Sequence, residues 1–91
     1  MVAWMQGKST QAAAHYATSN EYGRLLLQQE IDLGASQKDI EKAKTGLAMG
    51  IANHAVILDN LGRYAEAELE HKQAIEMLRD VRDVITLNQE L

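Results

Sequence analysis

The chain has 91 residues, a length that allows one domain with one hydrophobic core. Its net charge of −4 argues against the basic surface that nucleic-acid phosphates require. It has no Cys and no Pro, so disulfides and thiolate metal sites are excluded and no proline interrupts a long helix.

The apolar residues are largely Ala, Leu and Ile, with one Trp, three Tyr and no Phe. This mixture suits closely packed helices better than a sandwich or a barrel, and it predicts an all-α fold. No uncharged apolar run approaches the roughly 20 residues that a membrane helix needs. Residues 1–6 also lack the basic start and the length of a signal peptide. We therefore expect a cytoplasmic protein that does not contact a membrane.

Residues 1–8 show no hydrophobic period and are predicted to form a loose arm before the first helical segment, residues 9–35. Ser9 or Thr10 is a suitable cap for that segment, because a hydroxyl at this position accepts a hydrogen bond from a free first-turn N–H. The segment begins with a thin stripe of Ala12, Ala13 and Tyr16.

Thr18 and Glu21 have the spacing of a capping box, so residues 9–33 form either two short helices or one bent helix. Gly34 is predicted to end the segment, and Ser36 to cap the next helix. The side of this segment that is predicted to be buried carries Tyr22, Leu26, Gln29 and Leu33, and Leu25 and Ile31 are expected to widen its apolar surface.

The pattern from residue 37 to residue 60 predicts one continuous amphipathic helix. Its apolar positions recur at helical spacing: Ile40, Ala43, Leu47, Ile51, His54 and Leu58. Gly62 follows, where a left-handed conformation would end the helix at little cost.

A second stripe after the turn predicts an antiparallel partner helix. Its members are Tyr64, Ala67, His71, Ala74 or Ile75, and Leu78. Residues 83–91 either continue this helix or begin a further, truncated repeat, because no Gly or Pro marks an end.

The hairpin from Ala48 to about Val81 resembles a tetratricopeptide repeat, a 34-residue helix–turn–helix unit, over about a third of the chain. The matching residues are the small Ala55, the large Leu58, the turn pair Gly62 and Tyr64, and the second-helix alanines Ala67 and Ala74. The departures are Ile51 for the usual Trp, His54 for Leu, His71 for an aromatic residue and Arg79 for Pro. Tyr22 precedes Tyr64 by 42 residues, so residues 9–35 are a candidate degenerate repeat.

The resemblance implies a right-handed array of three or four helices, or a small bundle, with a groove lined by the first helix of each repeat. In chaperone-binding members a Lys and an Asn clamp a terminal carboxylate, but Ala52 and Val56 stand at those positions here. The family Asn that binds a target's backbone is kept as Asn53. We predict that Asn53, Ala52, Val56 and Asn60 bind a partner.

Three histidines could suggest a metal site, but no two of His15, His54 and His71 lie three or four residues apart. His54 and His71 could meet across the hairpin, and ordinary packing is the simpler interpretation. Glu66 and Glu70 are expected on an outward, solvated face. We predict no catalytic residue, no metal and no cofactor.

The leading hypothesis is a non-catalytic interaction module, a scaffold or adaptor that binds a peptide or helix of another protein. The alternative is a structural bundle of three long helices, about residues 10–33, 37–60 and 63–90, that self-associates or belongs to a larger solenoid. Isolated repeats expose an apolar end, which oligomerisation or neighbouring repeats would cover.

Overall fold

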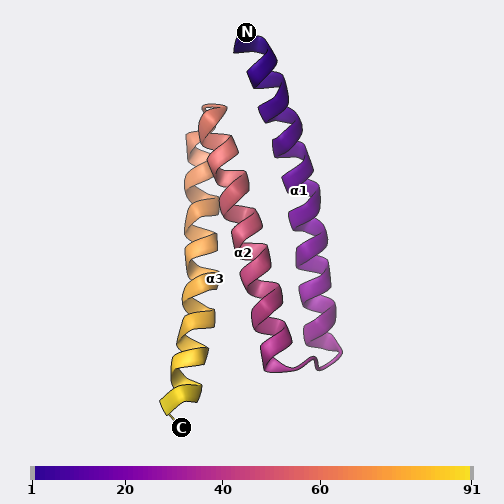
Figure 1. The fold of residues 1–91 in the computed structure, drawn as a ribbon, viewed down its shortest axis with the longest axis vertical. Helices are drawn as coiled ribbons and strands as arrows, with labels where there is room; N and C mark the ends of the chain where they lie inside the picture. The colour runs from indigo at the N-terminus through magenta and orange to yellow at the C-terminus, as the bar shows by residue number, and fades with distance from the viewer. Residues whose placement is uncertain (1, 91) are drawn as a thin grey trace.

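The computed structural model describes the backbone of residues 2–90 and the side chains of residues 7–83. Three helices follow one another: α1 (Val2–Asp32), α2 (Gln37–Asn60) and α3 (Tyr64–Glu90). No strand occurs in residues 2–90, so the predicted all-α class is confirmed. The helices run antiparallel, with α2 packed against both α1 and α3 (Figure 1).

The first helix differs from the prediction at its start, and in its middle it follows one of the two predicted alternatives. α1 begins at Val2, so the predicted loose arm over residues 1–8 is wrong for residues 2–8. Ala, Met, Gln and Lys in this stretch are good helix formers, and their propensity is sufficient without a hydrophobic period. α1 also continues through Thr18 and Glu21 as one helix, so the capping box does not divide it.

Both turns use a glycine in the left-handed region, as predicted. Gly34 has φ +76° and Gly62 has φ +80°. At the end of α2, the Arg63 N–H donates to the Leu58 carbonyl over 2.9 Å and the Gly62 N–H donates to the Asp59 carbonyl over 3.0 Å. This pair of bonds satisfies carbonyls that the helix leaves free. Ser36 caps α2, its Oγ accepting from the Asp39 N–H over 3.2 Å.

The core between α2 and α3 consists of two clusters of buried side chains. The clusters are Leu47, Ala48, Ile51 and Ala74, and, nearer the turn, Ala55, Leu58 and Ala67. Ile51 and Leu58 are the largest fully buried side chains. Alanines fill the opposing positions, which lets the helix axes approach closely. Leu47, Ile51 and Leu58 of the predicted α2 stripe are therefore buried as expected, whereas Ile40, Ala43 and His54 are only half-buried.

The contact between α1 and α2 depends on small side chains. Asn20 is only 6% exposed, and its Oδ1 lies 2.3 Å from the position that a Cβ on Gly50 would occupy. Gly23 lies opposite Leu47, whose Cδ1 would be 3.2 Å from a Cβ at position 23. The two backbones approach closely because neither glycine carries a side chain.

From residue 22 onward, the face of α1 that packs on α2 is the opposite of the predicted one, whereas Ala13 of the predicted first stripe is buried as expected. The predicted buried residues are exposed, with Leu33 at 77%, Leu25 at 65% and Tyr22 at 63%, and Leu26, Gln29 and Ile31 exposed as well. Asn20 and Leu27 face the interior instead. The side of α1 with the smaller residues packs on α2 because it permits the close approach at Gly50. Large side chains such as Tyr22 and Leu33 would hold the two backbones apart.

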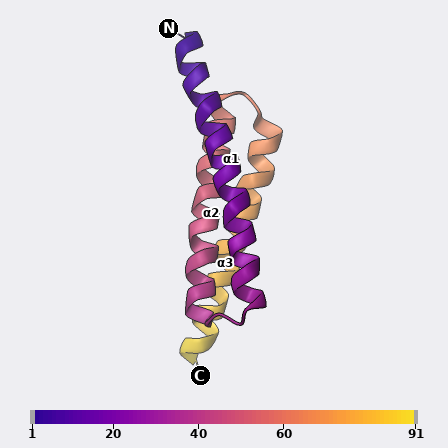
Figure 2. The same ribbon diagram turned by 90° about the vertical axis from the view of Figure 1, so that its right-hand side faces the viewer.

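The molecule is an elongated body with Cα extents of 55 × 25 × 17 Å. Its described ends lie at opposite ends of the long axis, and α1 partly overlies the α2–α3 pair in the turned view (Figure 2). α3 is continuous to Glu90, so residues 83–90 extend this helix and do not begin a new element. Within the described residues no helix combines the length and the apolar character that crossing a bilayer would demand.

Candidate functional site

Three of the four predicted partner-binding residues share one exposed stripe of α2. Asn53, Val56 and Asn60 are exposed, and Met49, one turn earlier, joins them with 59% exposure. We call these four residues the α2 open face. They lie opposite the buried stripe of the same helix, since steps of four, three and four residues keep to one side of a helix. Ala52 does not belong to this face, because it packs against the core cluster around Leu47.

The α2 open face is uncharged and alternates in chemistry along the helix. Met49 and Val56 are apolar, whereas Asn53 and Asn60 are amides. The Asn53 amide has no hydrogen-bond partner among the described side chains, so its donors and its acceptor are available to a ligand. Met49 was not predicted as a site residue, although its position four residues before Asn53 was a signal that could have identified it.

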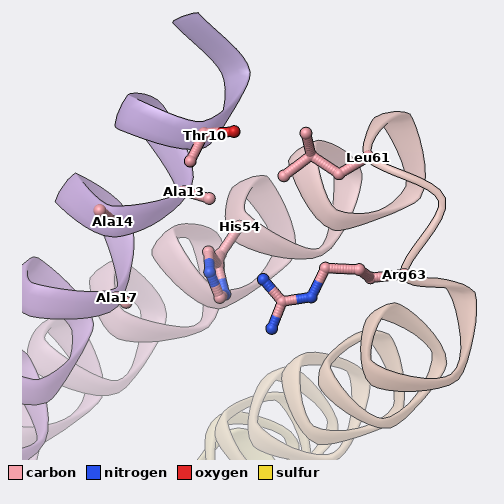
Figure 3. A pocket seen from close by; sticks show the side chains of 7 residues that line it. All are labelled: Thr10, Ala13, Ala14, Ala17, His54, Leu61 and Arg63. Carbon is pink, nitrogen blue, oxygen red and sulfur yellow. The ribbon is translucent and has the colours of Figure 1, made fainter. Parts of the chain in front are cut away.

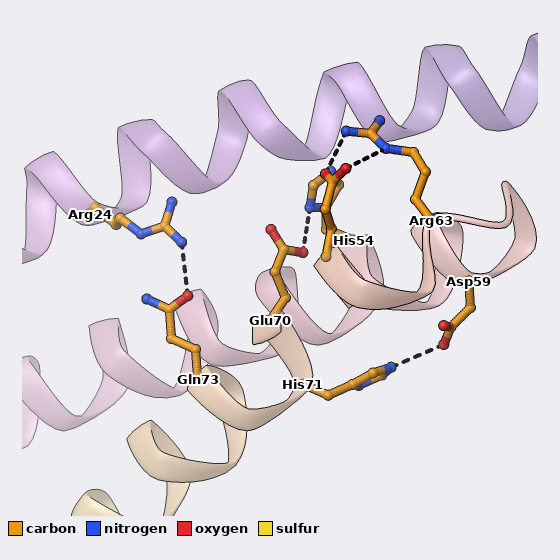
Figure 4. Close-up of polar contacts among 8 residues, drawn as sticks. Arg24, His54, Asp59, Arg63, Glu70, His71 and Gln73 are labelled. Atoms are coloured by element: carbon orange, nitrogen blue, oxygen red, sulfur yellow. Dashed lines mark hydrogen bonds and ion pairs between the residues drawn. The ribbon is translucent and has the colours of Figure 1, made fainter. Parts of the chain in front are cut away.

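Two histidine–carboxylate pairs connect α2 to α3 (Figure 4). His54 Nδ1 lies 2.6 Å from Glu70 Oε2, with side-chain exposures of 12% and 23%. His71 Nε2 lies 3.3 Å from Asp59 Oδ2 in a more exposed setting. The sequence allowed a contact between His54 and His71, but the two side chains do not meet. The predicted solvated position of Glu70 is also wrong, because its side chain is only 23% exposed. Each histidine instead binds an acid of the opposite helix.

Arg63, in the turn before α3, binds Glu66 through two parallel hydrogen bonds. Its Nε donates to Oε1 over 3.0 Å and its Nη2 donates to Oε2 over 2.5 Å. The hydrogen bond and the negative charge of Glu66 raise the pKa of Arg63 above its ordinary value. The bidentate geometry leaves the Nη1 hydrogens of Arg63 free for another acceptor.

A cleft of about 460 Å³ opens between α1 and the α2–α3 turn (Figure 3). Its residues are Thr10, Ala13, Ala14 and Ala17 of α1, together with His54, Leu61 and Arg63. The alanine side chains are too short to fill the space, and the side chains of His54 and Arg63 extend into it. The cleft thus offers a small apolar wall beside a cation, and the side chains of His54 and Arg63 already bind carboxylates.

A long-range contact joins the two outer helices. Arg24 Nη2 of α1 donates to Gln73 Oε1 of α3 over 3.4 Å (Figure 4). Gln73 therefore lies on the side of α3 that faces α1.

No group of three or more His, Asp or Glu side chains suited to a metal ion occurs in the part of the chain that the structure describes. His15 lies on α1 beside Tyr16, apart from the two cross-hairpin pairs.

A scan against protein-family models gives no match for the chain, and searches of curated proteins and of solved structures give no match either.

Proposed function

We propose that this chain is a non-catalytic, cytoplasmic protein–protein interaction module of the tetratricopeptide-like kind, which binds a peptide or helix of a partner on the α2 open face. The observation that carries the proposal is the exposed, uncharged stripe of alternating apolar and amide side chains on the central helix. A solvated helix face usually carries charges, and this one carries none from residue 49 to residue 60.

The spacing of the two amides suits an extended peptide. Asn53 and Asn60 are seven residues apart, which corresponds to about 10 Å along a helix. An extended chain covers this distance in about three residues. The two amides can thus bind backbone groups at both ends of a short peptide segment, while Met49 and Val56 contact its side chains. Met49 adds adaptability, because its unbranched thioether adjusts to different apolar partners.

The hairpin geometry also supports the tetratricopeptide-like interpretation. Ala55, Leu58 and Ala67, which match the motif, pack together in one buried cluster beside the turn. Gly62, at the motif's turn position, has a positive φ. The interpretation implies that the first helix of the hairpin lines the groove, and α2 is that helix.

Peptides selected from a random display library on the immobilised chain provide the test. Asn53→Ala should weaken a selected peptide about tenfold, which corresponds to about 1–1.5 kcal/mol for a lost hydrogen bond, and should leave the unfolding midpoint unchanged. The matched control is Gln11→Ala, which removes an exposed amide from α1. Equal affinities of the Asn53→Ala and Gln11→Ala variants by isothermal titration calorimetry would contradict the proposal.

A further inference from the structure

The cleft between α1 and the α2–α3 turn has the size and the lining of a small-molecule site. Its volume of about 460 Å³ lies within the range of roughly 300–1,000 Å³ that is typical of ligand pockets. Its apolar walls are three alanines of α1 and Leu61, and its polar side chains are those of Thr10, His54 and Arg63. An apolar cavity with a few convergent polar groups is the usual form of a ligand site.

His54 presents a hydrogen-bond acceptor to this cleft. Its Nδ1 lies 2.6 Å from Glu70 Oε2, and an ionised carboxylate can only accept a hydrogen bond. The single N–H of the neutral imidazole is therefore on Nδ1, and Nε2 carries a lone pair. No described residue donates to Nε2. The bond with Glu70 also holds the ring in place, between α1 and the guanidinium of Arg63 (Figure 3).

Arg63 presents hydrogen-bond donors beside this acceptor. Its Nε and Nη2 donate to the two carboxylate oxygens of Glu66, so Nη1 lies on the edge of the guanidinium that Glu66 does not occupy. The guanidinium extends into the cleft towards the ring of His54 (Figure 3). A donor and an acceptor therefore lie side by side at one end of an apolar space.

The charges around the cleft favour a neutral ligand. The hydrogen bond and the charge of Glu66, and to a smaller extent the charge of Glu70, raise the pKa of Arg63, so both carboxylates act on this cation. An anion that entered the cleft would meet the repulsion of Glu66 and Glu70, and a cation would meet Arg63. A neutral group that both donates and accepts a hydrogen bond avoids both penalties.

We propose that the cleft binds a small neutral molecule that carries an amide group on an apolar body. The amide N–H donates to His54 Nε2, the amide carbonyl accepts from Arg63 Nη1, and the apolar body packs against the alanines of α1 and Leu61. An amide suits the pair because its donor and its acceptor lie on neighbouring atoms of one plane. None of the α2 open face residues lines the cleft, so this site is independent of the peptide-binding function.

Three related probes test the proposal on the natural chain by nuclear magnetic resonance titration at mildly alkaline pH. Benzamide should shift the backbone amide signals of Ala13, Ala14 and His54 in a saturable way, with a dissociation constant of about 1 mM, as for other ligands of this size. N,N-dimethylbenzamide keeps the carbonyl but has no N–H, so it should bind about tenfold more weakly. Benzoate, which has no N–H and carries a negative charge, should bind more weakly still.

A substitution of His54 tests which atom accepts the amide hydrogen. His54→Asn keeps an N–H that can donate to Glu70 but removes Nε2. It should weaken benzamide about tenfold and leave the affinity for N,N-dimethylbenzamide unchanged, because the ligand change and the protein change remove the same hydrogen bond.

A substitution in the wall tests the location of the site. Ala14→Leu adds three carbon atoms to the α1 side of the cleft and should weaken benzamide more than tenfold. Ala65→Leu is the matched control: it makes the same change at an exposed position of α3 that does not line the cleft, and it should bind benzamide like the natural chain. Circular dichroism verifies that each variant folds.

The absence of a saturable shift up to the solubility limit of benzamide would overturn the proposal. Equal affinities of benzamide and N,N-dimethylbenzamide would overturn it as well, because no amide hydrogen would then be recognised. Tighter binding of benzoate would indicate a site for anions instead. Unchanged binding of benzamide by a folded Ala14→Leu variant would place the ligand outside the cleft. The probe series on the natural chain gives an answer even if a variant fails to fold.

Discussion

At the scale of single residues, two glycines one turn apart in α2 have different surroundings. A Cβ on Gly50 would lie 2.3 Å from Asn20 Oδ1, whereas a Cβ on Gly46 would meet nothing within 4 Å. Gly50 therefore makes room for α1, and Gly46 only lowers the helix propensity of α2.

We predict opposite effects of the same substitution at these two positions. Gly46→Ala should raise the free energy of unfolding by about 1 kcal/mol, because it adds helix propensity without a clash. Gly50→Ala should lower it by about 1–3 kcal/mol, because Asn20 or the α1 backbone must move. Urea denaturation measures both. The loss at position 50 should shrink in an Asn20→Ala background, and an unchanged loss there would refute the assigned contact.

Leu58 and Val56 test the two sides of α2. Leu58 is 1% exposed in the cluster beside the turn, and Val56 is 51% exposed on the α2 open face. Leu58→Ala should cost about 2–5 kcal/mol, as large-to-small changes in packed cores do. Val56→Ala should change the free energy of unfolding by no more than about 0.5 kcal/mol. Similar chemical-denaturation midpoints for the two variants would mean that the faces are wrongly assigned.

At the scale of the elements, the α2–α3 hairpin is held by its alanine-rich core and by two polar pairs of unequal burial. The side chains of His54 and Glu70 are 12 and 23% exposed, and those of His71 and Asp59 are 40 and 43% exposed. Burial strengthens a charge-assisted hydrogen bond, because less water competes for the donor and the acceptor.

The interaction energy of the His54–Glu70 pair should therefore exceed that of the His71–Asp59 pair. A double-mutant cycle with His54→Ala and Glu70→Ala should give an interaction energy of about 1–3 kcal/mol. The corresponding cycle with His71→Ala and Asp59→Ala should stay below about 1 kcal/mol, as for other exposed pairs. Thermal or urea unfolding at one fixed pH supplies the four stabilities of each cycle. A larger coupling for the exposed pair would contradict this ranking.

The sequence predicted the hairpin well and the first helix poorly, for a physical reason. Gly34, Ser36 and Gly62 act through their own backbone or side chain, so the local sequence is enough to place the ends of the helices. The buried face of α1 depends instead on what packs against it. The bulky Tyr22 and Leu33 were the stronger local signal, but the small Gly23 fits closely against Leu47 of α2.

The candidate site shows the same division between local and long-range information. Helical periodicity was sufficient to group Asn53, Val56 and Asn60 on one exposed face. It could not predict the partners of His54 and Glu70, because these depend on how far α3 is displaced along α2. Ala52 was grouped with the three exposed residues because the resemblance places it at a clamp position, but it packs against the core cluster around Leu47.

At the scale of the whole molecule, α2 is the only helix of the described chain that packs along two others. Its amide hydrogens are therefore shielded on two sides, whereas those of α1 and α3 are shielded on one. Local opening of an outer helix breaks one interface, but opening of α2 breaks both.

We predict that amide hydrogen exchange is slowest in the middle of α2, around Ile51 and Ala55, which are fully buried. Exchange measured by nuclear magnetic resonance should show faster exchange in residues 7–17 of α1, where the cleft opens beside the helix. Equal protection of residues 7–17 and of the middle of α2 would mean that the chain opens only as a whole.

An odd number of antiparallel helices also determines how the body responds to force. Because Val2 and Glu90 lie at opposite ends of a 55 Å axis, a pull applied to them acts along the helices. Such a load slides α1 and α3 in opposite directions over α2, so all the contacts of an interface resist it together. A hairpin pulled from one end would instead open contact by contact. The three-helix body would hold two attached molecules about 5 nm apart and would resist stretching more strongly than its small core suggests.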